Sequence, residues 1–460
     1  MAKTILVLTA ACLVCAWAAG PASAETYKVS DLETLAALVE GEAQPGDVIE
    51  VQSGTYMLDR PRLLVTSSGT PEAPIVITGV VRDGQRPVID ATKTHVRNGI
   101  FFFQRGTQHV ILENLELCHA QGDGRGFGQV FSRNAAGVFL EAANITVRHC
   151  YMHHNENGLF ATHDADFVII ENCDIGHNGR TEHVRGDGTP LNPHRTHNFY
   201  FSSRHQMVRN CYIHDSLDGE NFKSRGTNVI FAYNWVDEEV AYSVGVDSGN
   251  QQNTLWLANV VVKRTYPGIN QGRLLGIGDG TGVARGTTVA LNNTFVTWFP
   301  RDLYIFTEQS STGDVVFINN VFAGPGTHFM SVNGKGKLTG KNSWVAMAAG
   351  EIPEGFENTT RGDEPGFVSR TGMDFHLTAR SPLINAGVSA EEYSAAVRVV
   401  TQYSRQGEGA TPGPLWLKAL EDIEKPHPAF EPIRKAHGYT PRKAAGAIDI
   451  GAYEFAGAAQ

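Results

Sequence analysis

The sequence predicts an all-β fold, a single-stranded right-handed parallel β-helix (a solenoid), from a repeat that recurs along most of the chain. Each copy contains an apolar strand, a polar residue that is often Asn, any one residue, and a second strand of alternating apolar residues. The shortest interval between copies is 22–23 residues, which fits one three-stranded coil, and inserted loops explain the longer intervals. The regular leucine framework of a leucine-rich repeat is missing, and a propeller blade needs a longer and more even unit.

The clearest copies occupy residues 111–115, 147–152, 170–175 and 208–213, and weaker copies centre on Tyr233, Asn259, Asn293, Asn320 and Asn342. Some asparagines are expected to bond the backbone at the turn and to stack on the amide of the next coil: Asn114, Asn172, Asn210, Asn293 and Asn320. Three cysteines directly follow the turn position: Cys150, Cys173 and Cys211. Stacked coils hold such side chains roughly 4.8 Å apart, which is wider than a relaxed disulfide prefers. We therefore predict buried free thiols.

Residues 1–24 are typical of a secretory signal peptide. Lys3 precedes an apolar run over residues 4–20, and the small residues Ala22, Ser23 and Ala24 precede the expected cut. We therefore expect a secreted or periplasmic protein with no membrane attachment after cleavage.

The ends of the predicted β-helix, residues 25–388, carry capping signals. Residues 30–33 read as a capping box that opens a short helix through Val39 and covers the first coil. Residues 389–445 are expected to form a helical and Pro-rich excursion, with helices from residue 389 and over residues 415–423. We expect this excursion to pack on the outside of the β-helix, where it could form one side of a groove. Residues 446–460 form a C-terminal tail.

The formal net charge of −10 argues against a nucleic-acid partner. A negatively charged protein also does not attract a polyanion over long distances, so cationic side chains within the site must bind any anionic substrate. We expect a monomer that binds an acidic polysaccharide and needs no organic cofactor.

Strands that precede the Asn turn can be stacked by pattern over residues 138–141, 159–162, 199–202, 222–225 and 244–247. The first and third residue of each are apolar or small and point inward, and the second and fourth face solvent. One outward column contains Phe139, Phe160, Tyr200, Lys223 and Gly245, and the other contains Glu141, Thr162, Ser202, Arg225 and Asp247. Aromatic faces beside two cations on an open, rigid sheet suit an acidic sugar chain.

Cleavage of such a polymer by β-elimination needs a base, a group that neutralises the uronate carboxylate, and an acid for the leaving oxygen. We predict Lys223 as the base, because the like charge of a neighbouring arginine favours its neutral amine. Arg225 would pair with the carboxylate, and Tyr200 or His197 would supply the proton. Further substrate contacts are predicted for Phe160, His163, Asn198, Ser202, Asn221 and Asp247. On spacing alone, solvated surface charges are the more ordinary explanation of the two cations.

Asp218 and Glu220 lie two residues apart and could both reach one Ca²⁺ through carboxylate oxygens. An acidic, solvated turn is the alternative for these residues.

Residues 220–224, followed by 228–230, resemble the catalytic-lysine strand of the chondroitinase-B and alginate lyase group of parallel β-helix polysaccharide lyases. Residues 45–49, 54–56 and 73–77 agree with the start of that group, and residues 381–387 and 449–454 resemble ends shared by many secreted β-helix proteins. The resemblance implies Lys223 as base and Asp218 and Glu220 as calcium ligands. In that lyase group a catalytic arginine lies on the next coil, which corresponds to residues 243–247 here. This chain has no arginine in that segment, so Arg225 would substitute for it.

Two other functions fit the same fold. A parallel β-helix glycoside hydrolase would use a carboxylate pair, although the Asp motifs of polygalacturonases are absent as a set. A non-catalytic carbohydrate-binding or adhesive β-helix would need the aromatic and basic columns but no ionisable base.

Overall fold

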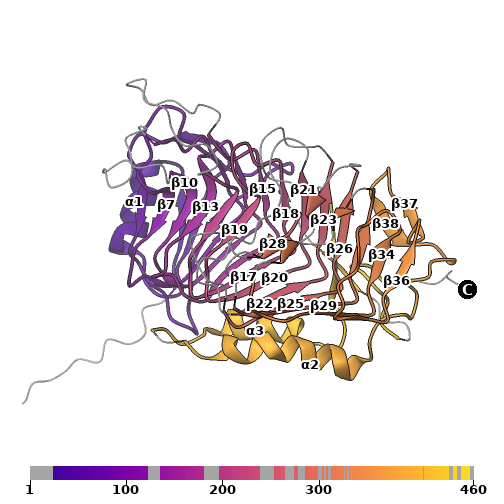
Figure 1. The fold of residues 1–460 in the computed structure, drawn as a ribbon. Coiled ribbons are helices and arrows are strands. Elements are labelled where there is room, and N and C mark those ends of the chain that lie inside the picture. The colour runs from indigo at the N-terminus through magenta and orange to yellow at the C-terminus, as the bar shows by residue number, and fades with distance from the viewer. Residues whose placement is uncertain are drawn as a thin grey trace, which may run out of the picture.

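The computed structural model describes residues 24–122, 135–180, 196–238, 253–264, 274–277, 285–298, 303–304, 307–308, 312–325, 327–328, 331–332, 334–407, 409–434, 439–442 and 447–455. Over these residues the chain forms the predicted parallel β-helix, with successive coils stacked along one axis (Figure 1). Three parallel sheets, here named A, B and C, form its sides.

Sheet A contains thirteen strands among the described residues: β1 (Thr26–Val29), β2 (Val48–Val51), β5 (Ile75–Gly79), β8 (Gln108–Glu113), β11 (Ala143–Arg148), β14 (Val168–Glu171), β17 (His205–Arg209), β20 (Asn228–Ala232), β22 (Asn253–Leu257), β25 (Thr287–Leu291), β29 (Asp314–Ile318), β33 (Leu338–Lys341) and β35 (Phe356–Glu357). Sheet B contains twelve in the same part of the chain: β3 (Thr55–Met57), β6 (Val88–Asp90), β9 (Glu116–Cys118), β12 (Tyr151–His153), β15 (Asp174–Gly176), β18 (Tyr212–His214), β21 (Trp235–Glu238), β23 (Val260–Lys263), β26 (Thr294–Thr297), β30 (Val321–Ala323), β34 (Trp344–Ala346) and β36 (Thr360–Gly362).

Sheet C has six described strands: β4 (Leu63–Val65), β7 (Gly99–Phe103), β10 (Ala136–Leu140), β13 (Asn157–Ala161), β16 (Phe199–Phe201) and β19 (Phe222–Ser224). Shorter parallel sets join β24 (Gly276–Ile277), β28 (Thr307–Glu308) and β32 (Ser331–Val332), and also β27 (Leu303–Tyr304) and β31 (Thr327–His328). Two antiparallel pairs follow: β37 (Phe367–Ser369) with β38 (Asp374–Leu377), and β39 (Phe430–Pro432) with β40 (Tyr439–Pro441).

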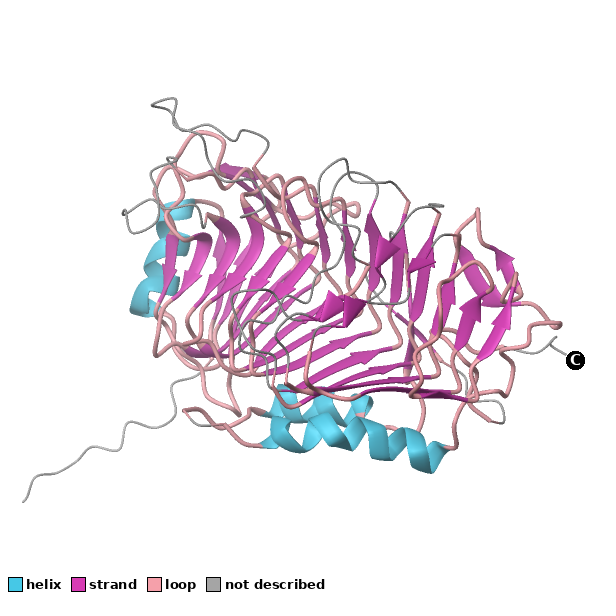
Figure 2. Ribbon diagram, in the orientation of Figure 1, coloured by secondary structure: helices cyan, strands magenta, loops and turns pink. Residues whose placement is uncertain are grey.

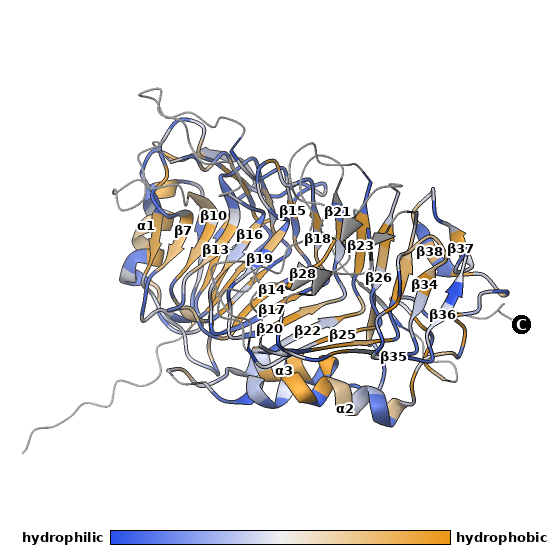
Figure 3. Cartoon of the chain, in the orientation of Figure 1, coloured by the Kyte–Doolittle hydropathy of each residue, from blue (hydrophilic) through white to orange (hydrophobic). Residues whose placement is uncertain are grey.

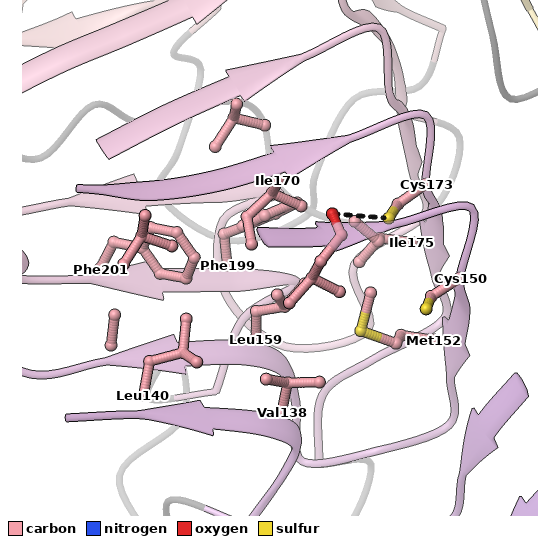
Figure 4. Packing of buried hydrophobic residues seen from close by; sticks show 14 of the residues in the cluster. Val138, Leu140, Cys150, Met152, Leu159, Ile170, Cys173, Ile175, Phe199 and Phe201 are labelled. Carbon is pink, nitrogen blue, oxygen red and sulfur yellow. Dashed lines mark hydrogen bonds between the residues drawn. The ribbon is translucent and has the colours of Figure 1, made fainter. Parts of the chain in front are cut away.

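The inward residues of the three sheets fill one continuous apolar core. In Figure 4, Leu159 and Phe199 of sheet C point toward Ile170 of sheet A and Ile175 of sheet B, and all four are fully buried. Figure 3 shows the resulting alternation of apolar and polar residues along the strands. Burial of large side chains at every coil supplies the main driving force for stacking.

Asparagine ladders run through two of the turns between sheets. In the turn between sheets A and B, Asn234, Asn259, Asn293 and Asn320 form one ladder, with Nδ2 to Oδ1 distances of 3.1, 2.9 and 3.0 Å. A second ladder joins Asn155, Asn178, Asn198 and Asn221 with distances of 3.0, 2.8 and 2.6 Å. Most ladder Oδ1 atoms accept both from the backbone amide and from the side-chain amide of the asparagine on the neighbouring coil, so the ladders fix the register of one coil on the next.

The structure corrects part of the asparagine assignment. Asn293 and Asn320 stack as predicted, but Asn114, Asn172 and Asn210 occupy the preceding turn position, where φ is positive (59°, 54° and 56°). Asparagine is favoured there because it tolerates the left-handed conformation. The asparagines of the early coils therefore lie one residue before the ladder position that Asn293 and Asn320 occupy in the late coils.

The predicted thiols are confirmed. Cys150, Cys173 and Cys211 are free and buried, and Figure 4 shows the first two at the edge of the core. They continue the column of the first ladder, because the amide of Cys211 donates to Oδ1 of Asn234. Burial raises the pKa of Cys150 and Cys173 well above the ordinary value, so these thiols remain protonated.

At the N-terminus, helix α1 (Leu32–Ala37) covers the first coil and continues into the π-helical turn η1 (Leu38–Glu42). The predicted capping box at residues 30–33 is wrong. Asp31 is the N-cap, and its carboxylate accepts a 2.7 Å hydrogen bond from the amide of Thr34.

The C-terminal excursion contains α2 (Ala390–Thr401), the 3₁₀ turn η2 (Gln402–Arg405) and α3 (Pro414–Ile423) (Figure 2). The predicted helix from residue 389 is confirmed, and it begins with a capping box of Ser389 and Glu392. The apolar side chains of both helices pack on the outward face of sheet A, where Val397 and Leu420 share a buried cluster with Leu255. The described helices of the excursion therefore cover the central strands of sheet A. None of the helices in the described part of the chain has the length and apolar content needed to span a bilayer.

Substituting Asn259→Ala should lower the free energy of unfolding by about 3 kcal/mol, because two buried donors of Asn234 lose their acceptor. Urea denaturation followed by circular dichroism measures this loss. Glu354→Ala, at an exposed position, is the control and should change little. Equal stabilities of the two variants would contradict a role of the ladder in holding coils together.

Candidate functional site

The predicted register of sheet C is confirmed over the described strands. Phe139, Phe160, Tyr200 and Lys223 are direct neighbours on β10, β13, β16 and β19. The amide of Arg225 donates a 2.5 Å hydrogen bond to Phe201, which extends the same pairing past the end of β19. Phe222 and Ser224 point inward, as the alternation requires.

An aromatic stripe crosses the outward face of sheet C. It consists of Phe102, Phe139, Phe160 and Tyr200, with successive ring centroids 5.4, 4.8 and 4.9 Å apart. Phe102 and Phe139 are covered (8% and 3% exposed), whereas Phe160 and Tyr200 are half-buried. The accessible part of the stripe therefore lies next to Lys223.

Lys223 is not solvent-exposed, although the sequence pattern predicted a lysine on an open surface. The residue is 9% exposed, and its Nζ lies 3.7 Å from Oε1 of Glu220. In a partly desolvated site this contact favours the charged ammonium form of the lysine. The neighbouring carboxylate thus opposes the effect that was expected from Arg225.

Glu220 links Lys223 to His197. Its Oε2 lies 2.8 Å from Nδ1 of His197, and its backbone amide lies 2.9 Å from the same nitrogen. Although burial opposes it, the positive charge of Lys223 and the contact with His197 hold the pKa of Glu220 well below its usual range. Burial and the nearby Lys223 lower the pKa of His197, so the buried imidazole is neutral at neutral pH.

Gly219 makes this arrangement possible. A Cβ at this position would lie 2.2 Å from Nδ1 of His197 and 2.6 Å from the carbonyl of Thr196. Only glycine lets the backbone approach the ring this closely. The glycine between the two acids therefore positions Glu220 against His197.

Arg225 lies beside the aromatic stripe. Its guanidinium carbon is 5.8 Å from the ring centre of Tyr200, within the range of a cation–π contact. The ring of Tyr200 is also 5.4 Å from that of His197. The structure thus brings together Lys223, Arg225, Tyr200 and His197.

Asp218 and Glu220 do not present the free carboxylate pair that a calcium ion needs. Oδ2 of Asp218 accepts hydrogen bonds from the amide and hydroxyl of Thr196, at 3.1 and 2.7 Å. The carboxylate of Glu220 faces Lys223 and His197. Both acids therefore complete the local fold, and the described donor set does not fit Ca²⁺.

The predicted substrate contacts of Asn198 and Asn221 are wrong. Both residues are fully buried and belong to the second asparagine ladder. The amide of Asn198 donates to the carbonyl of His214 and to Oδ1 of Asn221, so it has a structural role.

The remaining predicted contacts lie on or near the stripe. Phe160 is part of it, and Ser202 is half-buried on the column that contains Arg225. His163 lies in the turn after β13, with 80% of its side chain exposed. Asp247 lies outside the described residues.

Sequence reasoning missed two members of the site: Thr196 holds Asp218, and Gly219 admits the ring of His197. Glu220 was named as a metal ligand, but its contact with Lys223 was not expected. The order Asp-Gly-Glu just before a strand that carries an outward lysine was the available signal.

Comparison with known proteins shows the fold. A protein-family model described as "Right handed beta helix region" matches residues 78–255. The solved structure of pectate lyase Pel9A is similar over 95% of this chain and 98% of that chain, with a TM-score of 0.55 and 15% sequence identity. The chain is a right-handed β-helix. In architecture it is similar to a polysaccharide lyase.

Two further solved structures are less similar. A PL6 family polysaccharide lyase from Pseudopedobacter saltans covers 77% of this chain and 97% of its own, with 11% identity and a TM-score of 0.41. DFA-IIIase from Arthrobacter chlorophenolicus A6 covers 73% and 87%, with 13% identity and a TM-score of 0.45. No curated protein matches the chain in sequence.

The depressed pKa of Glu220 predicts a pH-dependent contribution to stability. The contribution is present above the unfolded value of about 4.3 and is lost as the pH falls through the lower folded value. The difference in unfolding free energy between the wild type and Glu220→Gln should therefore shrink below about pH 4.3. Urea titrations across the acid range measure it, with Glu354→Gln as an exposed control. A difference that stays constant with pH would rule out an ionised, paired Glu220.

Proposed function

We propose that the protein is a secreted polysaccharide lyase that cleaves a uronate-containing acidic polysaccharide by β-elimination. The observation that carries the proposal is the pairing of Tyr200 with Lys223 across β16 and β19, with Arg225 two residues further along. A sugar can lie along the accessible edges of the half-buried rings of Phe160 and Tyr200 while its carboxylate meets the two cations. The similarity of the fold to a pectate lyase supports a carbohydrate substrate.

Arg225 neutralises the uronate carboxylate. The guanidinium presents a planar set of donors that matches a carboxylate, and the ring of Tyr200 beside it restricts its orientation. Neutralisation makes the proton on the carbon next to the carboxyl more acidic, because the negative charge that develops during its removal is stabilised.

Lys223 acts as the base. Its neutral amine takes that proton, the electron pair of the broken C–H bond forms the new carbon–carbon double bond, and the bond to the glycosidic oxygen breaks. The hydroxyl of Tyr200, on the neighbouring strand, donates its proton to the leaving oxygen. The products are an unsaturated uronate at one new end and a free hydroxyl at the other.

His197 does not donate the proton. Its side chain is 1% exposed, so it cannot touch a sugar, and we assign it to positioning Glu220. Glu220 in turn holds Lys223 in place and stabilises its ammonium form, so the neutral amine is reached only as the pH rises. No step uses calcium, because Asp218 and Glu220 are engaged within the protein.

Lys223→Ala should abolish formation of the unsaturated-uronate chromophore, a loss of about 100-fold or more in kcat, as expected for removal of a general base. The assay incubates purified protein with pectate, alginate, glucuronan and glycosaminoglycans and records the near-ultraviolet absorbance. Lys335→Ala, at an exposed lysine, is the matched control.

The same assay separates the alternative functions. A hydrolase would release reducing ends without the chromophore, and a binding protein would release neither. Full activity of Lys223→Ala would show that another group is the base.

Glu220→Gln should shift the rising limb of the pH–rate profile to lower pH, because the neutral amide no longer stabilises the ammonium of Lys223. The dependence of kcat/KM on pH measures this shift. An unchanged rising limb would show that the base titrates independently of Glu220.

A further inference from the structure

The outward face of sheet B carries a cluster of metal-binding side chains away from the candidate site on sheet C. Asp90, Cys118 and His153 are direct neighbours on β6, β9 and β12. Glu116 precedes Cys118 on the same face of β9, and His119 follows in a left-handed turn position (φ 62°). Three successive coils therefore contribute to one cluster.

The donor atoms form two overlapping sets that share the sulfur of Cys118. One set contains Asp90, Cys118 and His119, the other contains Glu116, Cys118 and His153, and the ligand atoms within each set lie within 4.8 Å of one another. Nδ1 of His119 is 3.0 Å from Oδ1 of Asp90, and Nε2 of His153 is 3.1 Å from Oε1 of Glu116. Donors around a tetrahedral Zn²⁺ are separated by roughly 3.3–3.8 Å, so small side-chain rotations bring either set onto one ion.

We propose that this cluster is a transition-metal site of the zinc type, with Cys118 as the central ligand and His119, His153, Asp90 and Glu116 as the nitrogen and oxygen donors. Sulfur and imidazole ligands select zinc-like ions over calcium and magnesium, which prefer oxygen alone. The proposal does not depend on the proposed lyase activity.

Cys118 differs from the other described cysteines in its position. Cys150, Cys173 and Cys211 point inward at a turn, whereas Cys118 lies on the outward face of its strand and belongs to none of the three hydrophobic clusters. It is nevertheless 2% exposed, because the charged and imidazole side chains around it cover it. A thiol enclosed by carboxylates and imidazoles is a poor packing residue but a suitable metal ligand.

Electrostatics explain why a cation would stabilise this cluster. Two carboxylates, those of Asp90 and Glu116, lie in the same cluster as the sulfur of Cys118. A divalent cation bound by the thiolate would compensate the negative charge of these groups. Asp90 is already oriented, since its Oδ1 accepts a 2.8 Å hydrogen bond from the amide of Thr92.

A third set on the same sheet, His177, His214 and Asp215, serves as an internal contrast. Both ring nitrogens of His214 lie 3.0 Å from carboxylates, those of Asp174 and Asp215. Although burial opposes it, these two acids raise the pKa of His214 to about 9, so the ring is a cation at neutral pH. Because both ring nitrogens already face carboxylates, His214 has no nitrogen directed at His177, and we expect no metal there.

Titration of the purified, metal-free protein with Co²⁺ tests the proposal. We expect a thiolate-to-cobalt charge-transfer band in the near ultraviolet that saturates at one equivalent per chain and disappears when Zn²⁺ is added. The band should be lost in Cys118→Ser and weakened at least tenfold in affinity in His153→Gln. His177→Gln is the control and should retain the band.

Circular dichroism of each variant establishes that it is folded before the titration. The absence of a band in the wild type, or a band of equal intensity in Cys118→Ser, would overturn the proposal. Because the readout is spectroscopic, it gives an answer whether or not the protein cleaves a polysaccharide.

Discussion

Backbone hydrogen bonding between successive coils, held in register, determines where every functional side chain of this protein lies. Side chains of a strand point alternately toward the core and toward the outside. A slip of one residue on β19 would therefore turn Lys223 into the apolar core and turn Phe222 outward. The asparagine ladders oppose such a slip, because an amide displaced by one residue would leave buried donors and acceptors unpaired. The stacking of coils is therefore both the fold and the means by which the site is assembled from residues of different coils.

The three sheets leave the solenoid with three outward surfaces of different chemistry. The central strands of sheet A, from β14 to β25, are apolar on their outward face, and α2 and α3 cover them there. Sheet C presents aromatic rings that end at two cations, and the early coils of sheet B present imidazoles, carboxylates and one thiol. The later strands of sheet B, from β21 to β34, are apolar outside and pack against the C-terminal residues. The character of each surface follows from the residue types at a few outward positions of the repeat.

Local electrostatics matter more here than net charge. The chain is acidic overall, yet the candidate site depends on Lys223 and Arg225, and the ionisation of the site is set by groups a few ångströms away. His197 is buried and the side chain of Glu220 is only 12% exposed, so their mutual contact and the contact with Lys223 act in a medium that screens poorly. The same reasoning explains the paired carboxylates around His214 on sheet B.

The sequence alone determined the solenoid, the buried thiols, the helices of the C-terminal excursion and the alternation that places Lys223 beside Tyr200, because each depends on local periodicity. Only the tertiary structure decided that Asn198 and Asn221 are interior rungs, that Glu220 faces Lys223 and His197, and that the excursion covers sheet A. These features depend on which residue of one coil meets which residue of the next. Insertions of variable length separate the coils, so linear spacing does not specify that pairing, and contact between coils does.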